Sequence, residues 1–207
     1  MNILHITPLG KLCGIATYAS NLLSSFPSSH DTREIPPKNV FSQLSEKAIL
    51  DWVDLTIEFA NKYDIIHIQH EFGLFCGDKP LSFGMKVFYR LLKGLKQANK
   101  NVCVTFHSEP VFLKALGLFN FEEKACAKIW KKLSQFFRDS KGFTAIVHNN
   151  SSCQIFQSTG FENTKVIVHG VIKTNPPKKS IKRFGYVNLS IFGYISDYKG
   201  HAFALSV

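Results

Sequence analysis

Short apolar runs alternate with longer amphipathic stretches along the chain. The apolar runs are rich in β-branched residues and cover residues 2–7, 64–69, 101–106, 142–147, 164–168 and 187–192. Runs of this kind, with little polar alternation, are typical of parallel strands that are covered on both faces. Helical spacing is found between them, with Ser45 as the expected N-cap of the second stretch, over residues 15–26, 43–61, 83–99, 121–137 and 151–158. The alternation predicts an α/β fold with a doubly wound, Rossmann-like parallel sheet.

The composition changes after Val171. Residues 172–183 contain two Pro, five basic residues and no acidic residue, which is typical of a linker. We therefore expect a domain over residues 1–171, a linker over 172–186 and the start of a second domain over 187–207. One strand and the beginning of a helix cannot bury a core, so the second domain is expected to be truncated.

Composition excludes several classes of protein. Of the 207 residues, 45% are hydrophobic and 19% are charged, which excludes a disordered chain and a coiled coil. No apolar run is long enough to span a membrane, and the N-terminus lacks the basic start of a signal peptide. The five Cys are scattered and form no C-x-x-C pair, so we expect free thiols. These features predict a cytoplasmic protein.

The chain carries a formal net charge of +10, which favours anionic partners. No helix-turn-helix, zinc-finger or RNA-binding motif accompanies the charge, so no nucleic acid is expected. Four basic residues, Lys86, Arg90, Lys93 and Lys100, fall near one side of a predicted helix, and an apolar stretch over 111–121 follows. They predict either a peripheral contact with an anionic membrane or an ordinary solvated helix face beside a buried loop.

Ligands of doubly wound sheets bind beyond the carboxyl ends of the strands, so the residues that follow each strand are candidate site residues. Gly14 opens the first helix, where free N–H groups can bind a phosphate, although a plain strand–helix turn would look the same. His70 and Glu71 follow the second predicted strand. They do not predict a metal site, because H-E-x-x-H is absent and His67 and His70 point to opposite faces of a strand.

Three further strand ends carry polar residues. His107 follows the third predicted strand, where an imidazole can bind a phosphate or a sugar hydroxyl. His148 precedes Asn149 and Asn150 after the fourth strand. This polar segment could line a cleft, or Ser151 could cap the next helix. Lys199 stands beside Gly200 after the last strand, where it could contact a phosphate or lie exposed on the surface.

Taken in order, these segments resemble glycosyltransferase family 4, the retaining enzymes of GT-B architecture. The resemblance runs from Asn2 to about Ala204 and rests on residues 13–18, 64–70, 104–107, 166–171 and 192–200. It implies two facing Rossmann-like domains, the first holding mainly the acceptor and the second mainly the nucleotide-sugar donor. It also implies that neither a metal nor a cofactor is needed.

The resemblance assigns roles to individual residues. Gly14 would approach the donor diphosphate, Lys199 would contact it, and His107 would be the catalytic residue beside the reacting sugar and the acceptor. The further residues expected to bind substrate are Tyr18, His70, Glu71 and His148. The implied partners are a UDP- or GDP-sugar and a saccharide or lipid-linked acceptor.

Three departures from the family qualify this expectation. Cys13 stands where the family commonly has the first of two glycines, Tyr194 stands where it commonly has a basic residue, and its paired-glutamate motif should follow Val207. We therefore expect a glycosyltransferase-like protein that is weak or inactive alone and could be completed by a downstream donor-domain chain. The alternative is a non-catalytic sugar- or nucleotide-binding module, or one half of a split enzyme.

Overall fold

The structure is a computed structural model of the 207-residue chain. It describes residues 1–10, 13–26, 29–110 and 120–170. The predicted linker, the sixth predicted strand, Lys199 and most of the apolar stretch after Pro110 lie outside the described residues. Residues Met1–Gly170 form one compact unit.

Six parallel strands form a single sheet in the order β2-β1-β3-β4-β5-β6. The strands are β1 (Ile3–Thr7), β2 (His30–Glu34), β3 (Ile65–His70), β4 (Asn101–Phe106), β5 (Phe143–Val147) and β6 (Thr164–Val166). The helices are α1 (Gly14–Ser24), α2 (Lys38–Gln43), α3 (Glu46–Ala60), α4 (Leu81–Gln97), α6 (Asn120–Arg138) and α7 (Asn150–Ser158). The predicted α/β fold with a Rossmann-like parallel sheet is confirmed.

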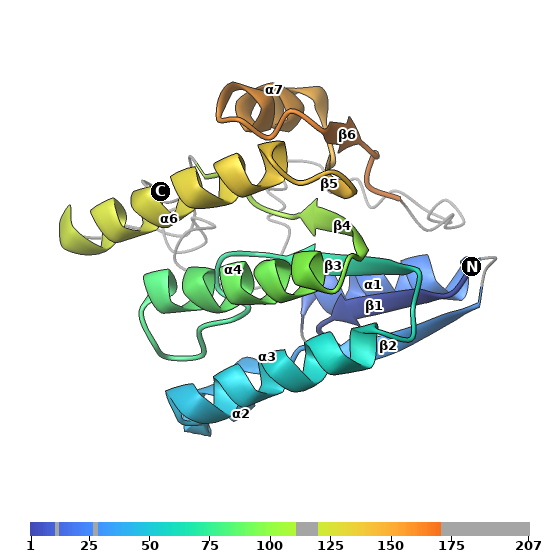
Figure 1. The fold of residues 1–207 in the computed structure, drawn as a ribbon, viewed down its shortest axis with the longest axis horizontal. Coiled ribbons are helices and arrows are strands. Elements are labelled where there is room, and N and C mark those ends of the chain that lie inside the picture. The colour runs from blue at the N-terminus through green and yellow to red at the C-terminus, as the bar shows by residue number, and fades with distance from the viewer. Residues whose placement is uncertain (11–12, 27–28, 111–119, 171–207) are drawn as a thin grey trace, which may run out of the picture. The chain divides into compact units, whose positions relative to one another are not determined.

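One face of the sheet holds the hydrophobic core. Alternate strand residues point to this face and are fully buried, namely Leu4, Ile6, Ile66, Ile68, Val102 and Val104. Helices α3, α4 and α6 lie side by side over it (Figure 1). Phe106 at the end of β4 packs against Phe156 and Phe161, with ring centroids 4.8 and 5.8 Å apart, so aromatic rings fill the space between the sheet and the helices.

The opposite face is more polar, and α1 lies on that side, behind β1 in Figure 1. His5, His67, Gln69 and Thr105 point to this face, because strand side chains alternate between the two faces. The ring of His5 packs edge-on against Phe26, just after the end of α1, at 5.1 Å between centroids. A polar layer thus lies between the sheet and α1.

Two elements were not predicted. Strand β2 has the sequence His-Asp-Thr-Arg-Glu, which contains no apolar residue, and it forms one edge of the sheet beside β1. Its hydrogen bonds to β1 define it as a strand, and no hydrophobic pattern could reveal it. Helix α2 has 6 residues, which is too short for a helical period to be recognised.

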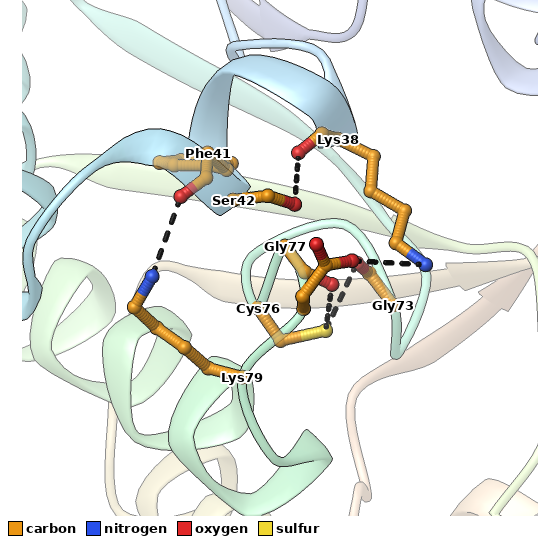
Figure 2. A network of polar contacts seen from close by, with 8 residues as sticks. Lys38, Phe41, Ser42, Gly73, Cys76, Gly77 and Lys79 are labelled. Atoms are coloured by element: carbon orange, nitrogen blue, oxygen red, sulfur yellow. Dashed lines mark hydrogen bonds and ion pairs between the residues drawn. The ribbon is translucent and has the colours of Figure 1, made fainter.

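The segment that joins β3 to α4, residues 71–80, makes polar contacts with α2 (Figure 2). The Lys79 ammonium group donates hydrogen bonds to the carbonyl oxygens of Phe41 and Leu44, at 3.4 and 2.8 Å, and so satisfies the end of α2. Gly77 turns this segment with a φ of 60°, where an added Cβ would lie 2.8 Å from the backbone nitrogen of Ser42. The segment is therefore held in place before α4 begins.

Candidate functional site

Four aromatic side chains meet at the carboxyl edge of the sheet. The ring centroid of Tyr18 lies 5.1 Å from that of His107, 5.3 Å from that of His148 and 4.6 Å from that of His169. His148 in turn lies 5.1 Å from His107 and 5.0 Å from His169. We call these four residues the Tyr-His cluster.

The parallel sheet explains why residues so distant in the sequence meet. His107 directly follows β4, and its backbone N–H donates to the carbonyl oxygen of His70 at 3.0 Å, which continues the pairing with β3. His148 directly follows β5, and His169 comes shortly after β6. Since parallel strands end at the same edge of a sheet, the residues after them converge there, and α1 places Tyr18 over them.

A chain of hydrogen bonds runs behind His107, along the α1 side of the sheet. With the Gln69 amide oxygen facing it, His107 Nε2–H donates to Gln69 Oε1 at 2.7 Å. His67 Nε2 then accepts hydrogen bonds from the Thr105 hydroxyl at 2.8 Å and, at the longer distance of 3.4 Å, from Gln69 Nε2. His67 Nδ1–H donates to His5 Nδ1 at 3.0 Å. We call these five residues the polar chain.

A separate hydrogen bond orients His148. Its Nδ1–H donates to the carbonyl oxygen of Ile167 at 3.0 Å, which leaves Nε2 as a lone pair. This Nε2 atom is buried and has no hydrogen-bond partner among the described residues. An unpartnered buried acceptor is unfavourable, so it marks a place where a ligand that donates a hydrogen bond would be stabilised.

Three imidazoles of the site, those of His107, His67 and His148, have lowered pKa values. Burial, followed by the proximity of His148 and His169, lowers the pKa of His107 to about 4. Burial and the neighbouring imidazoles lower the pKa of His67 to about 3, and burial also lowers the pKa of His148. Burial therefore favours the uncharged form of these three rings, which can act as hydrogen-bonding groups.

Gly14 lies one helical turn before Tyr18 on α1, so the two residues share a face of the helix. A Cβ added at Gly14 would meet nothing within 4 Å, and the side chain of the N-cap residue Cys13 makes no capping hydrogen bond. A hollow of about 500 Å³ lies beside this part of α1, lined by Leu9, Gly10, Ala16, Thr17, Ser20 and Asn21. Gly14 itself is not among the residues that line this hollow.

The structure places His70 outside the site, which corrects its expected role in binding substrate. His70 is the last residue of β3, and its side chain points to the core face. It is 2% exposed there, and its ring centroid lies 4.1 Å from that of Phe88. Glu71 lies at the carboxyl edge and is half-buried, and its carboxylate accepts a hydrogen bond from the Ser108 hydroxyl at 3.1 Å. Glu71 thus contacts Ser108, the residue next to His107.

No three His, Cys, Asp or Glu side chains within the described ranges are grouped so that they could hold a metal ion. Within the polar chain both ring nitrogens of His67 are used in hydrogen bonds, whereas His5 Nε2 is buried and has no hydrogen-bond partner among the described residues.

Two of the four basic residues considered for membrane contact have partners inside the protein. Arg90 makes an ion pair with Asp54 at 2.8 Å, and the Lys100 ammonium donates to the carbonyl oxygens of Asn61 and Tyr63, both at 2.9 Å. Lys86 and Lys93 remain exposed. In the described part of the chain no helix is long and apolar enough to cross a membrane. Peripheral contact with an anionic membrane stays a prediction, and co-sedimentation with anionic liposomes at low salt would test it.

Tyr18, His107 and His148 were predicted from the sequence as site residues, and the structure brings these three together. His169 and Gln69 were not predicted as site residues. His169 carried the same signal as His107, a histidine just after a predicted strand. Gln69 could have been found from its spacing of two from His67, which puts both polar side chains on one face of an otherwise apolar strand.

No family model, no curated protein and no solved structure matches this chain. The resemblance to glycosyltransferase family 4 therefore remains a prediction from the sequence motifs.

Proposed function

We propose that residues 1–170 form the acceptor-side domain of a GT-B-type glycosyltransferase, which transfers a sugar from a UDP- or GDP-sugar to a saccharide or lipid-linked acceptor. The observation that carries the proposal is the meeting of His107, His148 and Tyr18 at the carboxyl edge of a parallel sheet. Uncharged imidazoles and an aromatic ring suit a sugar, which offers hydroxyl groups and an apolar ring face.

The roles of the residues follow from their chemistry. His107, held neutral by burial, can accept a hydrogen bond from a hydroxyl group and so hold it in line for transfer. The start of α1 at Gly14 has no side-chain cap, so its backbone N–H groups could bind the expected diphosphate. Lys199, which the resemblance assigns to the same diphosphate, lies outside the described residues.

A second candidate function uses the same site without catalysis. The four residues of the Tyr-His cluster include no carboxylate. The cluster can therefore bind a saccharide through its rings and hydroxyl group without an acidic side chain. The chain would then be a sugar- or nucleotide-binding module, or one half of a split enzyme. Turnover separates these candidates, because all of them predict binding.

The test is calorimetric titration of the purified chain with UDP- and GDP-sugars, alone and together with any encoded donor-domain partner, followed by a turnover assay. The Tyr18→Phe variant removes a hydroxyl group inside the cluster. Tyr89→Phe removes one from a ring packed on Phe136, which serves as the matched control. We expect binding that weakens in the first variant and not in the second. Absence of binding with and without a partner would contradict the proposal.

A further inference from the structure

The two histidines at the centre of the cluster are oriented from behind by different partners. Gln69 Oε1 accepts from His107 Nε2–H, and the Ile167 carbonyl oxygen accepts from His148 Nδ1–H. A neutral imidazole carries one proton, so the other nitrogen of each ring must be a lone pair. For His107 this nitrogen is Nδ1, and for His148 it is Nε2.

We infer that these two hydrogen bonds give the site a fixed polarity: His107 and His148 both present acceptors, so the site takes an uncharged group that donates two hydrogen bonds, such as a pair of sugar hydroxyls. Gln69 is the positioning residue that sets this polarity at His107. The inference deepens the proposed function and rests on it only for the identity of the ligand.

The polar chain has a proton arrangement that matches this orientation of Gln69. Its amide nitrogen can only donate and faces His67 Nε2, so this nitrogen of His67 is a lone pair, to which the Thr105 hydroxyl also donates. His67 in turn donates through Nδ1–H to His5. A reversed Gln69 amide would require the opposite tautomers at His67 and His107, so the amide orientation and the two tautomers are set together.

The same polarity excludes an anion. Phosphate oxygens are acceptors and would meet the lone pairs of His107 and His148. Protonating the rings would remove this conflict, but burial and the neighbouring imidazoles disfavour their charged forms. Phosphate groups of a donor would therefore bind away from these two ring nitrogens, which are suited to hydroxyl groups.

The orientation can be read directly by nuclear magnetic resonance. We would label the full chain with ¹⁵N-histidine and record long-range ¹H–¹⁵N correlations at neutral pH, which show which ring nitrogen carries the proton. We expect Nε2–H for His107 and Nδ1–H for His67 and His148. Nδ1–H at His107 or Nε2–H at His148 would overturn the inference.

Variants of Gln69 test its positioning role. In Gln69→Leu we expect loss of the protected His107 Nε2–H proton signal, whereas Gln135→Leu on the exposed side of α6 should leave it unchanged. Gln69→Glu keeps an acceptor at this position and should keep His107 in the Nε2–H tautomer. This variant therefore tests the positioning role of Gln69 if the leucine variant does not fold. A His107 proton signal that is the same in the leucine variant as in the parent chain would contradict the role of Gln69.

Two probes test the class of ligand. Methyl glucoside should shift the ring resonances of His107 and His148, and inorganic phosphate should not. Loss of the Gln69 hydrogen bond should weaken the glucoside about two- to tenfold, the range expected for one hydrogen bond. Shifts with phosphate, or no shift with the glucoside, would overturn the class of ligand. If the glucoside shifts the rings while no nucleotide sugar is bound or turned over, the proposed transferase function fails and this inference stands.

Discussion

Glu122 of α6 closes the N-terminal end of α4 through Ser82. The Glu122 carboxylate accepts a hydrogen bond from the backbone N–H of Ser82 at 2.6 Å and a second from the Ser82 hydroxyl at 3.1 Å. Helix α4 has Pro80 at its N-cap, which provides no side-chain capping group. A carboxylate from another helix therefore satisfies the free donors and complements the positive end of the helix dipole.

Removing this carboxylate should destabilise the protein. We expect Glu122→Ala to lower the free energy of unfolding by about 1–2 kcal/mol, the range for loss of a helix cap. Urea unfolding would measure the effect. Glu123→Ala is the matched control, because within the described residues Glu123 makes no hydrogen bond or ion pair. Equal losses in the two variants would show that the contact with Ser82 contributes nothing.

Two glycines of α4 should respond differently to alanine. At Gly84 an added Cβ would lie 2.8 Å from Cys76 Cβ and 3.0 Å from the Cys76 backbone nitrogen, which are fixed atoms. At Gly94 it would lie 2.2 Å from Ile57 Cδ1, the end of a side chain that can rotate away. Alanine gains about 1 kcal/mol over glycine inside a helix. We therefore expect Gly94→Ala to stay within about 1 kcal/mol of the parent chain, and Gly84→Ala to lose roughly 1–3 kcal/mol.

Urea unfolding of both variants, with the slope of the transition compared, would test this expectation. The two positions share one helix and one substitution, so their difference isolates what the new methyl group meets. A Gly84→Ala variant as stable as Gly94→Ala would mean that the segment around Cys76 yields without cost.

His70 should make the fold sensitive to acid. Burial lowers its pKa from 6.5 to about 3 in the folded chain. Between these values the unfolded chain binds more protons than the folded chain, so stability falls as the pH falls from about 6.5 toward 3 and is constant with respect to this group above 6.5. The slope from one such group is at most about 1.4 kcal/mol per pH unit.

His70→Leu should reduce this slope, because leucine does not titrate and fits an aromatic surrounding. Thermal or urea unfolding at a series of pH values would show it, with the two proteins compared above pH 7 as the reference. His5, His67 and His107 also have lowered pKa values, so a slope should persist in the variant. An unchanged slope would mean that His70 titrates normally in the folded chain.

His169 should influence the titration of His148. Burial comes first and His169 second among the effects that lower the pKa of His148, while the Ile167 carbonyl raises it. His169→Ala removes an exposed ring that lies 5.0 Å from His148, so we expect the pKa of His148 to rise toward 6.5. A ¹⁵N-histidine titration followed by NMR would measure it, with His67 as the internal reference that should not move. A pKa of His148 that stays unchanged would show that the two rings do not interact in solution.

Much of the fold could be predicted because its strands are short apolar runs. The run over 101–106 coincides with β4, and Ser45 is the N-cap of α3, accepting a hydrogen bond from the Ala48 backbone N–H at 3.1 Å. Strand β2 could not be predicted, because a strand at the edge of a sheet needs no apolar residues when its hydrogen bonds to a neighbour hold it in place.

Site residues could be predicted only where they directly follow a predicted strand. His107 and His148 were found because each follows an apolar run directly. His70 was misplaced because β3 runs one residue further than the apolar run, and His70 pairs with Phe106 within the sheet. This extra residue turns His70 toward the core and leaves Gln69 beside His107. Because the strand ends one residue later than expected, Gln69 rather than His70 reaches the site.

The charged sequence of β2 also bears on how copies of this protein meet. An exposed strand at the edge of a sheet can pair with the same strand of another molecule and start aggregation. Here the edge carries Asp31, Arg33 and Glu34, and the Asp31 carboxylate is bound by the Tyr63 hydroxyl at 2.8 Å. A second molecule would have to bury these charges to add a strand. The charges on β2 therefore disfavour pairing of this strand with a strand of another molecule, even in a concentrated solution.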